Sequence, residues 1–304
     1  MIVHSMKDVP TQVASEFAVA AIGARDEPRD AVVMSTTNQA KGWRSLKDLP
    51  EGGVVGTSSV RRAAMVRRTY PHLVIQDVRG NVGTRLRKLD DVSLGFDALV
   101  LAGAGVQRLG LGDRVSSWLG SEEGVLHAVG QGALGVEWRA GDEWVAQLLE
   151  GIGRGKESRR VRWECVAERS LLRALEGGCS VPVGVQCAWE DARLSENAST
   201  VVGEDYQHQH TDTENAGYEN DDAIPAPTGP ETATDGGVLT LRAMVVSLDG
   251  KECVEGLRRG FVGSDREAEE VAMGMYGSLV EGGAERILKK ITLNRGMIGA
   301  RDGA

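Results

Sequence analysis

Cationic side chains concentrate in one stretch of the chain, residues 56–88. This stretch contains eight basic residues against a single acid, Asp77, although the whole chain has a formal net charge of −9. Arginine stays charged and presents a planar fork of donors that matches carboxylate or phosphate oxygens. The stretch therefore predicts an anion-binding site. Its basic residues are Arg61, Arg62, Arg67, Arg68, Arg79, Arg85, Arg87 and Lys88.

Glycines and hydroxyl side chains lie between these arginines. Residues 56–59 (GTSS) follow the apolar residues 54–55, and residues 80–84 (GNVGT) follow Val78. Both segments are typical of a strand that leads into the start of a helix, where free backbone N–H groups bind anions. The backbone of these two turns is therefore expected to assist the arginines.

Three further residues offer chemistry elsewhere in the chain. Asp8 follows Lys7 at the exit of an apolar strand, and this pair is either a general acid/base carboxylate with a binding cation or a surface turn. Cys179 follows two glycines in a loop, so it is either a reactive thiol or a small buried hydrophobic residue. Arg108 is either another anion contact or a solvated helix residue.

The elements that must position these residues alternate between strand and helix. Apolar strand patterns cover residues 17–23, 31–34, 53–56, 73–78 and 96–102, with helical patterns at 59–69 and 82–89. A loop is expected at residues 36–42, and a strand at residues 134–138. Such alternation favours an α/β fold with a parallel, doubly wound sheet that binds its ligand at the carboxyl ends of the strands.

The second half of the chain has a different pattern. A helix with one apolar face is predicted at residues 163–175, followed by a half-buried strand at 181–187. Residues 238–247 and 252–262 predict a hairpin, and Ser264 begins a capping box that starts a long helix. Together these elements predict a small α+β domain from about residue 156 onward.

One segment carries the acidity of the chain. Residues 190–237 contain twelve acids and one base, a net charge of −11 that leaves +2 for the remainder. The segment is rich in polar residues and Pro and poor in large aliphatic ones, so we expect a disordered insert. His208 and His210 within it are either a metal pair or a chance pair in a polar loop.

The composition is that of an ordinary globular protein. The four cysteines are too sparse and irregular for a disulfide framework or a zinc ribbon, so reduced thiols are expected. A run of about 18 apolar residues is absent and the N-terminus does not resemble a signal peptide, which favours a cytoplasmic protein without a membrane span. Aromatic residues make up 4% of the chain, and this argues against a nucleic-acid partner.

Six strings of this chain, taken together, closely resemble the porphobilinogen deaminase (hydroxymethylbilane synthase) family. The resemblance follows chain order and covers most of the sequence outside the acidic insert. The strings are VHSMKDVP at 3–10, DEPRDA at 26–31, VGTSSVRR at 55–62, RGNVGTRLRKLD at 79–90, AVGQGALGVE at 128–137 and LEGGCSVPVG at 175–184.

The resemblance implies two lobes like periplasmic anion-binding proteins and a small α+β domain. The first domain comprises residues 1–28 and 132–153, the second 29–131, and the third 156–304 with the insert 190–237. It also implies a monomeric transferase of heme and tetrapyrrole biosynthesis. Such an enzyme condenses four porphobilinogen molecules head to tail, with release of ammonia, on a covalent dipyrromethane cofactor.

The resemblance also implies the roles of individual residues. Cys179 holds the dipyrromethane through a thioether, and Asp8 is the catalytic carboxylate that stabilises the cationic azafulvene left by loss of ammonia. Each pyrrole carries an acetate and a propionate, which arginine binds bidentately. The cofactor contacts are Lys7, Ser59, Arg61, Arg62, Arg79 and Gly80, and the substrate contacts are Arg79, Arg85, Arg108 and Gln131; no metal is implied.

The N-terminus and the activity of the chain are the subject of two further expectations. The family has a segment before VHSMKDVP that completes the first domain, so we expect the chain as written to be poorly stable and weakly active or inactive. A non-enzymatic anion-binding module of the periplasmic-binding type is the rival reading, and it needs the arginines but not Cys179.

Overall fold

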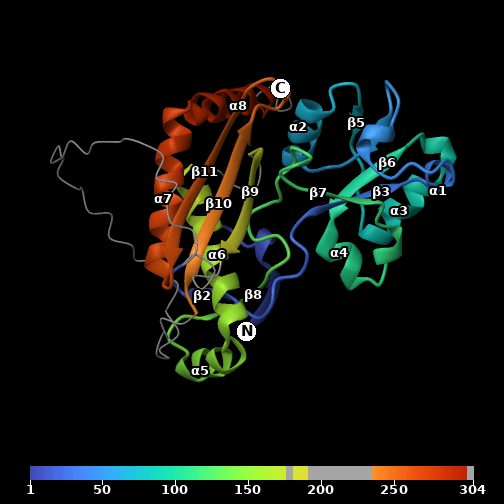
Figure 1. The fold of residues 1–304 in the computed structure, drawn as a ribbon. Helices are drawn as coiled ribbons and strands as arrows, with labels where there is room; N and C mark the ends of the chain where they lie inside the picture. The colour runs from blue at the N-terminus through green and yellow to red at the C-terminus, as the bar shows by residue number, and fades with distance from the viewer. Residues whose placement is uncertain (176–180, 191–234, 300–304) are drawn as a thin grey trace, which may run out of the picture.

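The computed structural model describes residues 1–175, 181–190 and 235–299, with side chains up to residue 291. Strands in these residues form three sheets of five, three and three strands, joined and covered by helices (Figure 1). The fold is therefore mixed α/β, as the sequence predicts. Cys179, His208, His210 and most of the acidic insert lie outside the described residues.

The five-stranded sheet has the strand order β5-β4-β6-β3-β7. β4 pairs in parallel with β5 and β6, but β3 pairs antiparallel with β6 and β7. The prediction of a parallel sheet is therefore wrong at β3, which runs opposite to the other four strands. β3 enters this sheet from β2 of another sheet through residues 22–29, so it does not follow a helical crossover from a parallel neighbour. The strands are β3 (Asp30–Met34), β4 (Val54–Gly56), β5 (Val74–Gln76), β6 (Ala98–Ala102) and β7 (Ser117–Leu119).

Apolar side chains cover both faces of this sheet, because successive residues of a strand point to opposite sides. Val32 packs in one cluster with Met65 of α2. Val33 packs on the other face with Leu86 and Leu89 of α3. The helices of this part are α1 (Thr36–Ala40), α2 (Val60–Thr69), α3 (Val82–Asp90) and α4 (Gly103–Arg108).

The first three-stranded sheet is antiparallel and has the order β1-β8-β2. Val19 packs with Val161 of α6 in one cluster, whereas Ala20 and Leu149 of α5 belong to another. The sheet is thus held between two helices. Its elements are β1 (Ile2–Ser5), β2 (Phe17–Ala21), β8 (Leu134–Arg139), α5 (Glu143–Ile152) and α6 (Lys156–Ala174).

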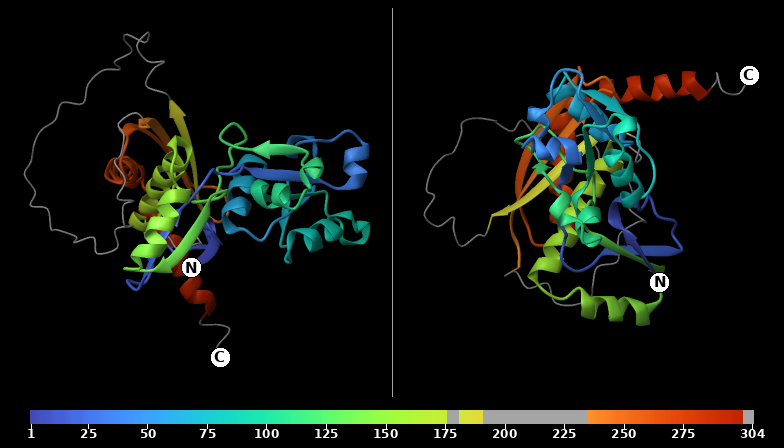
Figure 2. Two further views of the ribbon diagram at one scale, coloured as in Figure 1. Left: turned by 90° about the horizontal axis from the view of Figure 1, so that it is seen from below. Right: turned by 90° about the vertical axis from the view of Figure 1, so that its right-hand side faces the viewer.

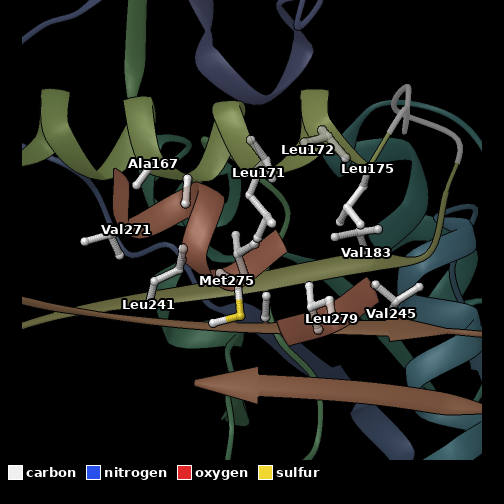
Figure 3. Packing of buried hydrophobic residues seen from close by; sticks show 14 of the residues in the cluster. Ala167, Leu171, Leu172, Leu175, Val183, Leu241, Val245, Val271, Met275 and Leu279 are labelled. Atoms are coloured by element: carbon white, nitrogen blue, oxygen red, sulfur yellow. The ribbon is translucent and has the colours of Figure 1, made fainter. Parts of the chain in front are cut away.

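The second three-stranded sheet, β11-β10-β9, is also antiparallel and contains the predicted hairpin. Figure 3 shows Leu171 of α6, Met275 of α7 and Leu241 of β10 directed into the space between the helices and the sheet. The apolar faces of the two helices and the sheet form a common core. Its elements are β9 (Val183–Glu190), β10 (Gly237–Val246), β11 (Cys253–Val262), α7 (Asp265–Glu281) and α8 (Ala284–Gly299).

The three sheets are linked at a common junction. Residues 22–29 lead from β2 to β3, and residues 120–133 lead back from β7 to β8. In Figure 2 the five-stranded sheet and its helices form a unit to one side of the other two sheets. Met244 and Val246 of β10 nevertheless pack with Met65 of α2, so the C-terminal sheet contacts that unit directly.

Most local predictions are confirmed. The helices at 59–69 and 82–89, the hairpin and the helix that starts after Ser264 are present with similar bounds. α6 begins at Lys156 instead of Trp163, and α1 replaces a predicted loop because the Ser35 side chain caps it at the amide of Asn38. α5 was not predicted. Among the described residues, no helix combines the length and apolar character that crossing a membrane requires.

Two methionines of α7 test the packing of the C-terminal core. Met275 is fully buried, whereas Met273 is 49% exposed on the same helix. Met275→Ala removes buried apolar atoms and leaves a cavity, so it is expected to lower the free energy of unfolding by about 2 to 5 kcal/mol. Met273→Ala is expected to change it by less than about 0.5 kcal/mol. Urea unfolding measures both, and equal effects would contradict this packing.

Candidate functional site

A buried carboxylate lies at the junction of the sheets. Asp30 is the first residue of β3 and is 0% exposed. Its backbone pairs with Ala102 of β6 and Leu119 of β7, so the side chain starts from an interior strand of the five-stranded sheet. A charge in such a place requires close partners of opposite sign, because burial strongly disfavours an isolated ion.

Two arginines of α2 supply those partners. Arg61 donates from Nη1 to Oδ2 of Asp30 over 2.8 Å, and Arg62 donates from Nε to Oδ1 over 2.9 Å. Both arginines are buried, at 5% and 6% exposure. They lie in the first turn of the helix, where the macrodipole disfavours cations, so the contact with Asp30 offsets this unfavourable position.

Gln131 joins this cluster from the second connecting segment. Its side-chain amide donates to the carbonyl of Pro28 over 2.6 Å and to Oδ1 of Asp30 over 2.8 Å. Its Oε1 accepts from Nη2 of Arg62 over 3.3 Å. Gln131 therefore links both connecting segments to α2. It has a structural role here and also remains a candidate for binding the substrate.

The cluster keeps an excess of positive charge. Burial tends to raise the pKa of Asp30, but the adjacent guanidiniums of Arg61 and Arg62 outweigh it and hold this pKa well below its usual range. Burial lowers the pKa of Arg61, and Asp30 opposes that effect. Two guanidiniums thus share one carboxylate in a dry environment. A second anion at this place would be strongly attracted by the guanidiniums, because little solvent is present to screen their charges.

Lys7 brings a further cation to the same place. It lies in a short 3-10 turn, Met6–Asp8, that directly follows β1. Burial lowers the pKa of Lys7, and the charge of nearby Arg62 lowers it further. Among the described residues, Lys7 makes no side-chain hydrogen bond or ion pair. Asp8, the next residue, is exposed. The turn thus places a half-buried ammonium and an accessible carboxylate side by side in the chain.

The loop before α3 and its first turn extend the cationic surface. Burial lowers the pKa of Arg85, and the charge of Arg62 lowers it further, which shows that Arg85 belongs to the same electrostatic environment. Arg85 donates from Nε to the carbonyl of Gly80 over 2.7 Å. Gly80 has φ of +121°, and a Cβ there would lie 2.8 Å from Cγ2 of Thr84, so this turn requires glycine.

The remaining predicted residues have simpler surroundings. Arg79 has an 84% exposed side chain and pairs with its neighbour Asp77 at 2.8 Å. Arg108 donates to Asp26 over 2.7 Å and to the carbonyl of Gly132 over 3.1 Å. Ser59 caps α2 through its hydroxyl, which accepts from the amide of Arg62. The structure therefore brings Lys7, Arg61, Arg62, Arg85 and Gln131 together, with Arg79 and Arg108 further out on the surface.

Sequence reasoning missed two residues that shape the site. Asp30 appeared in the sequence only within the string DEPRDA at 26–31, although an acid directly before the apolar residues 31–34 is itself a signal of a buried partner. Arg169 lies beside Glu168 within an otherwise apolar stretch of α6, and both are buried, at 4% and 0% exposure. Their charges lie on the predicted apolar face of the helix, and this was the signal in the sequence that they are buried and paired.

The chain is similar to one protein family over most of its length. The sequence model "Porphobilinogen deaminase, dipyromethane cofactor binding domain" matches residues 1–147, and "Porphobilinogen deaminase, C-terminal domain" matches 163–227. The porphobilinogen deaminase of Yarrowia lipolytica is 42% identical over 293 residues, covering 96% of this chain and 71% of that protein. The one of Neurospora crassa is 39% identical over 303 residues, covering 98% and 75%. The one of Prochlorococcus marinus is 39% identical over 289 residues, covering 95% and 73%.

Removing the charge of Asp30 tests the buried cluster. Asp30→Asn leaves two buried guanidiniums without their shared carboxylate, so the free energy of unfolding at pH 7 is expected to fall by about 3 to 5 kcal/mol. The exposed Asp113 provides a matched control, and Asp113→Asn is expected to change it by less than about 0.5 kcal/mol. Urea unfolding at pH 7 makes the comparison, and similar values for both variants would contradict the cluster.

The pH dependence of the same variants has a defined sign. The pKa of Asp30 is lower in the folded than in the unfolded state, so its stabilisation is present above the unfolded value of about 4 and is lost as the pH falls below it. Wild type is therefore expected to lose more stability than Asp30→Asn between about pH 4 and pH 2. Parallel pH profiles of the two proteins would contradict this assignment.

Proposed function

Because the chain belongs to the porphobilinogen deaminase family, we propose that the cations around Asp30 bind the carboxylates of its dipyrromethane cofactor and of its substrate. The chain is a transferase of tetrapyrrole biosynthesis, a hydroxymethylbilane synthase. It joins four porphobilinogen molecules head to tail and releases ammonia at each step. The observation that carries the proposed site is the excess of positive charge where Lys7, Arg61 and Arg62 surround a single buried carboxylate, that of Asp30.

The residues present fit a dipyrromethane. Each of its two pyrrole rings carries an acetate and a propionate, and this part of the chain offers a half-buried lysine without an anionic partner among the described residues. It also offers two buried arginines that share a single carboxylate. When bound, the dipyrromethane supplies the primer to which the first substrate is joined. We propose Cys179, through its sulfur, as the point of attachment.

The carboxylate-binding residues are proposed to hold their positive charges at fixed positions for the ligand. Lys7, Arg61 and Arg62 are held by the turn after β1 and by the first turn of α2, so their charges are fixed before any ligand arrives. Preorganised charges cost no reorganisation at the moment of binding. Ser59 caps α2 and so fixes the direction of its first turn, while Gly80 shapes the turn before α3.

The outer residues are proposed to receive the substrate and the growing chain. Arg79 is mostly exposed, whereas Arg85 is partly buried and close enough to Arg62 for their charges to interact. Together the two residues extend the cationic surface outward. Arg108 and Gln131 border this surface from α4 and from the second connecting segment. Each added pyrrole brings two more carboxylates, and arginine is suited to them because it stays charged and binds bidentately.

Asp8 is proposed as the catalytic carboxylate. It is exposed, and among the described residues its side chain makes no hydrogen bond, so it is free to accept one from a pyrrole N–H. Loss of ammonia from porphobilinogen leaves positive charge on the substrate ring, and a fixed carboxylate stabilises that charge as it develops. Asp8 can also take up the proton that leaves when the new carbon–carbon bond has formed.

The domain arrangement is proposed on the same basis. The three sheets support a first domain of residues 1–28 and 132–153, a second of residues 29–131 and a third that begins at residue 156. In this arrangement the first two are lobes like periplasmic anion-binding proteins. The cluster of Asp30, Arg61, Arg62 and Gln131 lies where the connecting segments pass between them. Such a position suits a ligand that contacts both lobes.

The attachment point is tested by intact mass. Purified protein is expected to exceed its polypeptide mass by one covalent dipyrromethane, and Cys179→Ser is expected to show the polypeptide mass alone. Cys187→Ser is a matched control, because Cys187 is a second cysteine eight residues later in the sequence, on β9, and it is expected to keep the added mass. An unmodified wild-type mass would favour the rival reading of a non-enzymatic anion-binding module.

The role of Asp8 is tested by turnover. Asp8→Asn keeps the shape of the side chain but removes its charge, so kcat is expected to fall by roughly 10²- to 10⁴-fold. The added cofactor mass should remain, because the carboxylate-binding cations are unchanged. Glu16→Gln removes an exposed carboxylate from the same part of the chain and should retain normal kcat. Normal turnover in Asp8→Asn would remove Asp8 from the mechanism.

A further inference from the structure

Helix α6 buries two consecutive charged residues near its C-terminal end. Glu168 is 0% and Arg169 is 4% exposed. Buried charges persist only where they are paired or hydrogen-bonded, so their contacts indicate what the helix holds. Neither residue has a role in binding the cofactor or substrate as proposed above, since neither belongs to the cationic surface around Arg62.

Arg169 contacts the backbone that directly follows Asp8. Its Nη1 donates to the carbonyl of Val9 over 3.1 Å, and its Nη2 donates to the carbonyl of Pro10 over 2.6 Å. Arg173, one helical turn later, donates to the carbonyl of Thr11 over 3.3 Å. This segment lies between β1 and β2 and is not part of a strand, so its carbonyls at residues 9–11 accept hydrogen bonds from the guanidinium groups of α6.

Glu168 holds the other side of the same turn. Its Oε2 accepts from the amide of Gly130 over 2.7 Å, and its carboxylate pairs with Arg25. Gly130 packs directly on the turn, because a Cβ at this glycine would lie 2.9 Å from Cγ of Met6 and 3.1 Å from the amide of Lys7. Adjacent residues of one helix thus fix the backbone on both sides of Lys7 and Asp8.

We propose that Arg169 is a positioning residue that sets the location of the Asp8 carboxylate through the backbone of Val9 and Pro10. The inference rests on the proposed catalytic role of Asp8. The planar fork of arginine reaches two carbonyl oxygens at once, which a lysine ammonium on a flexible stem cannot match. Losing one of these contacts lets the Asp8 end of the turn move, while Arg61 and Arg62 on α2 and Arg85 on α3 stay in place.

The variant that tests the proposal is Arg169→Lys, which keeps the charge but loses the fork. A shift of about 1 Å in a catalytic group can cost on the order of 10²-fold in rate. We therefore expect kcat to fall by about 10- to 100-fold, with KM for porphobilinogen changed by less than about threefold. The covalent cofactor mass is expected to remain complete.

Arg162 provides a matched control on the same helix. It is 8% exposed, and its Nε donates to the Asp265 carboxylate of α7 over 2.9 Å, away from the Asp8 turn. Arg162→Lys perturbs a buried arginine in the same way, so any effect of general destabilisation should appear in both variants. We expect Arg162→Lys to retain wild-type kcat. Equal losses in the two variants would overturn the proposal.

A double-mutant cycle separates a positioning role from a structural one. If Arg169 acts through Asp8, the double variant Arg169→Lys with Asp8→Asn is no slower than Asp8→Asn alone. Multiplicative losses would overturn the proposal. If Arg169→Lys does not fold, Arg173→Gln takes its place and is expected to give a smaller loss of kcat in the same direction, with unchanged kcat as the contrary result.

The failure of this inference is distinguishable from failure of the proposed function. Normal kcat in Arg169→Lys, with full turnover loss in Asp8→Asn and a cofactor mass in wild type, overturns the positioning role alone. Normal turnover in Asp8→Asn, or an unmodified wild-type mass, overturns the proposed function whatever Arg169 does. Each set of measurements therefore decides one of the two claims.

Discussion

The contact between the Asp30 carboxylate and the guanidiniums of Arg61 and Arg62 holds the centre of this molecule together. Bringing three charges out of water costs several kcal/mol per ion, and the cost is met only where geometry and further hydrogen bonds are good. Here every carboxylate oxygen has a donor, and Gln131 of the second connecting segment also donates to Asp30 and to Pro28 of the first connecting segment. The arrangement fixes α2 against β3 and leaves one positive charge in excess, and that excess makes the place suitable for a carboxylate ligand.

Helix α6 provides the second support. Glu168 and Arg169 hold the backbone on either side of the Lys7 and Asp8 turn, while the apolar face of the same helix packs on the C-terminal sheet. The helix ends at Ala174, five residues before Cys179 in the sequence. One element thus connects the turn that carries Asp8, the junction of the sheets and the chain that leads towards Cys179. Function depends on distances between groups that lie far apart in the sequence.

Local features of the structure followed from the sequence, and long-range features did not. The arginine-rich stretch, the capped start of α2 and the β10–β11 hairpin depend on neighbouring residues, so period and turn chemistry were enough to predict them. The antiparallel direction of β3 depends on which strands it pairs with after the chain passes from one sheet to the next. No local sequence pattern encodes this pairing. Asp30 was missed as a partner for the same reason, because its arginines lie some thirty residues later, at Arg61 and Arg62. The resemblance to a family named roles for Lys7 and Asp8, but only the structure shows the helix that holds them.

We propose that ligand carboxylates complete an incompletely neutralised buried cluster. The most direct test uses the cofactor-loaded Asp8→Asn variant, in which turnover is slowed, and compares its binding of porphobilinogen with that of the dimethyl ester, which has the same ring and no carboxylate charge. Two lost charge-assisted contacts of about 1.5 kcal/mol each predict binding weaker by on the order of 10²-fold. Equal Kd values for the acid and the ester would contradict the account, because the cations around Asp30 would then have no part in recognising the substrate.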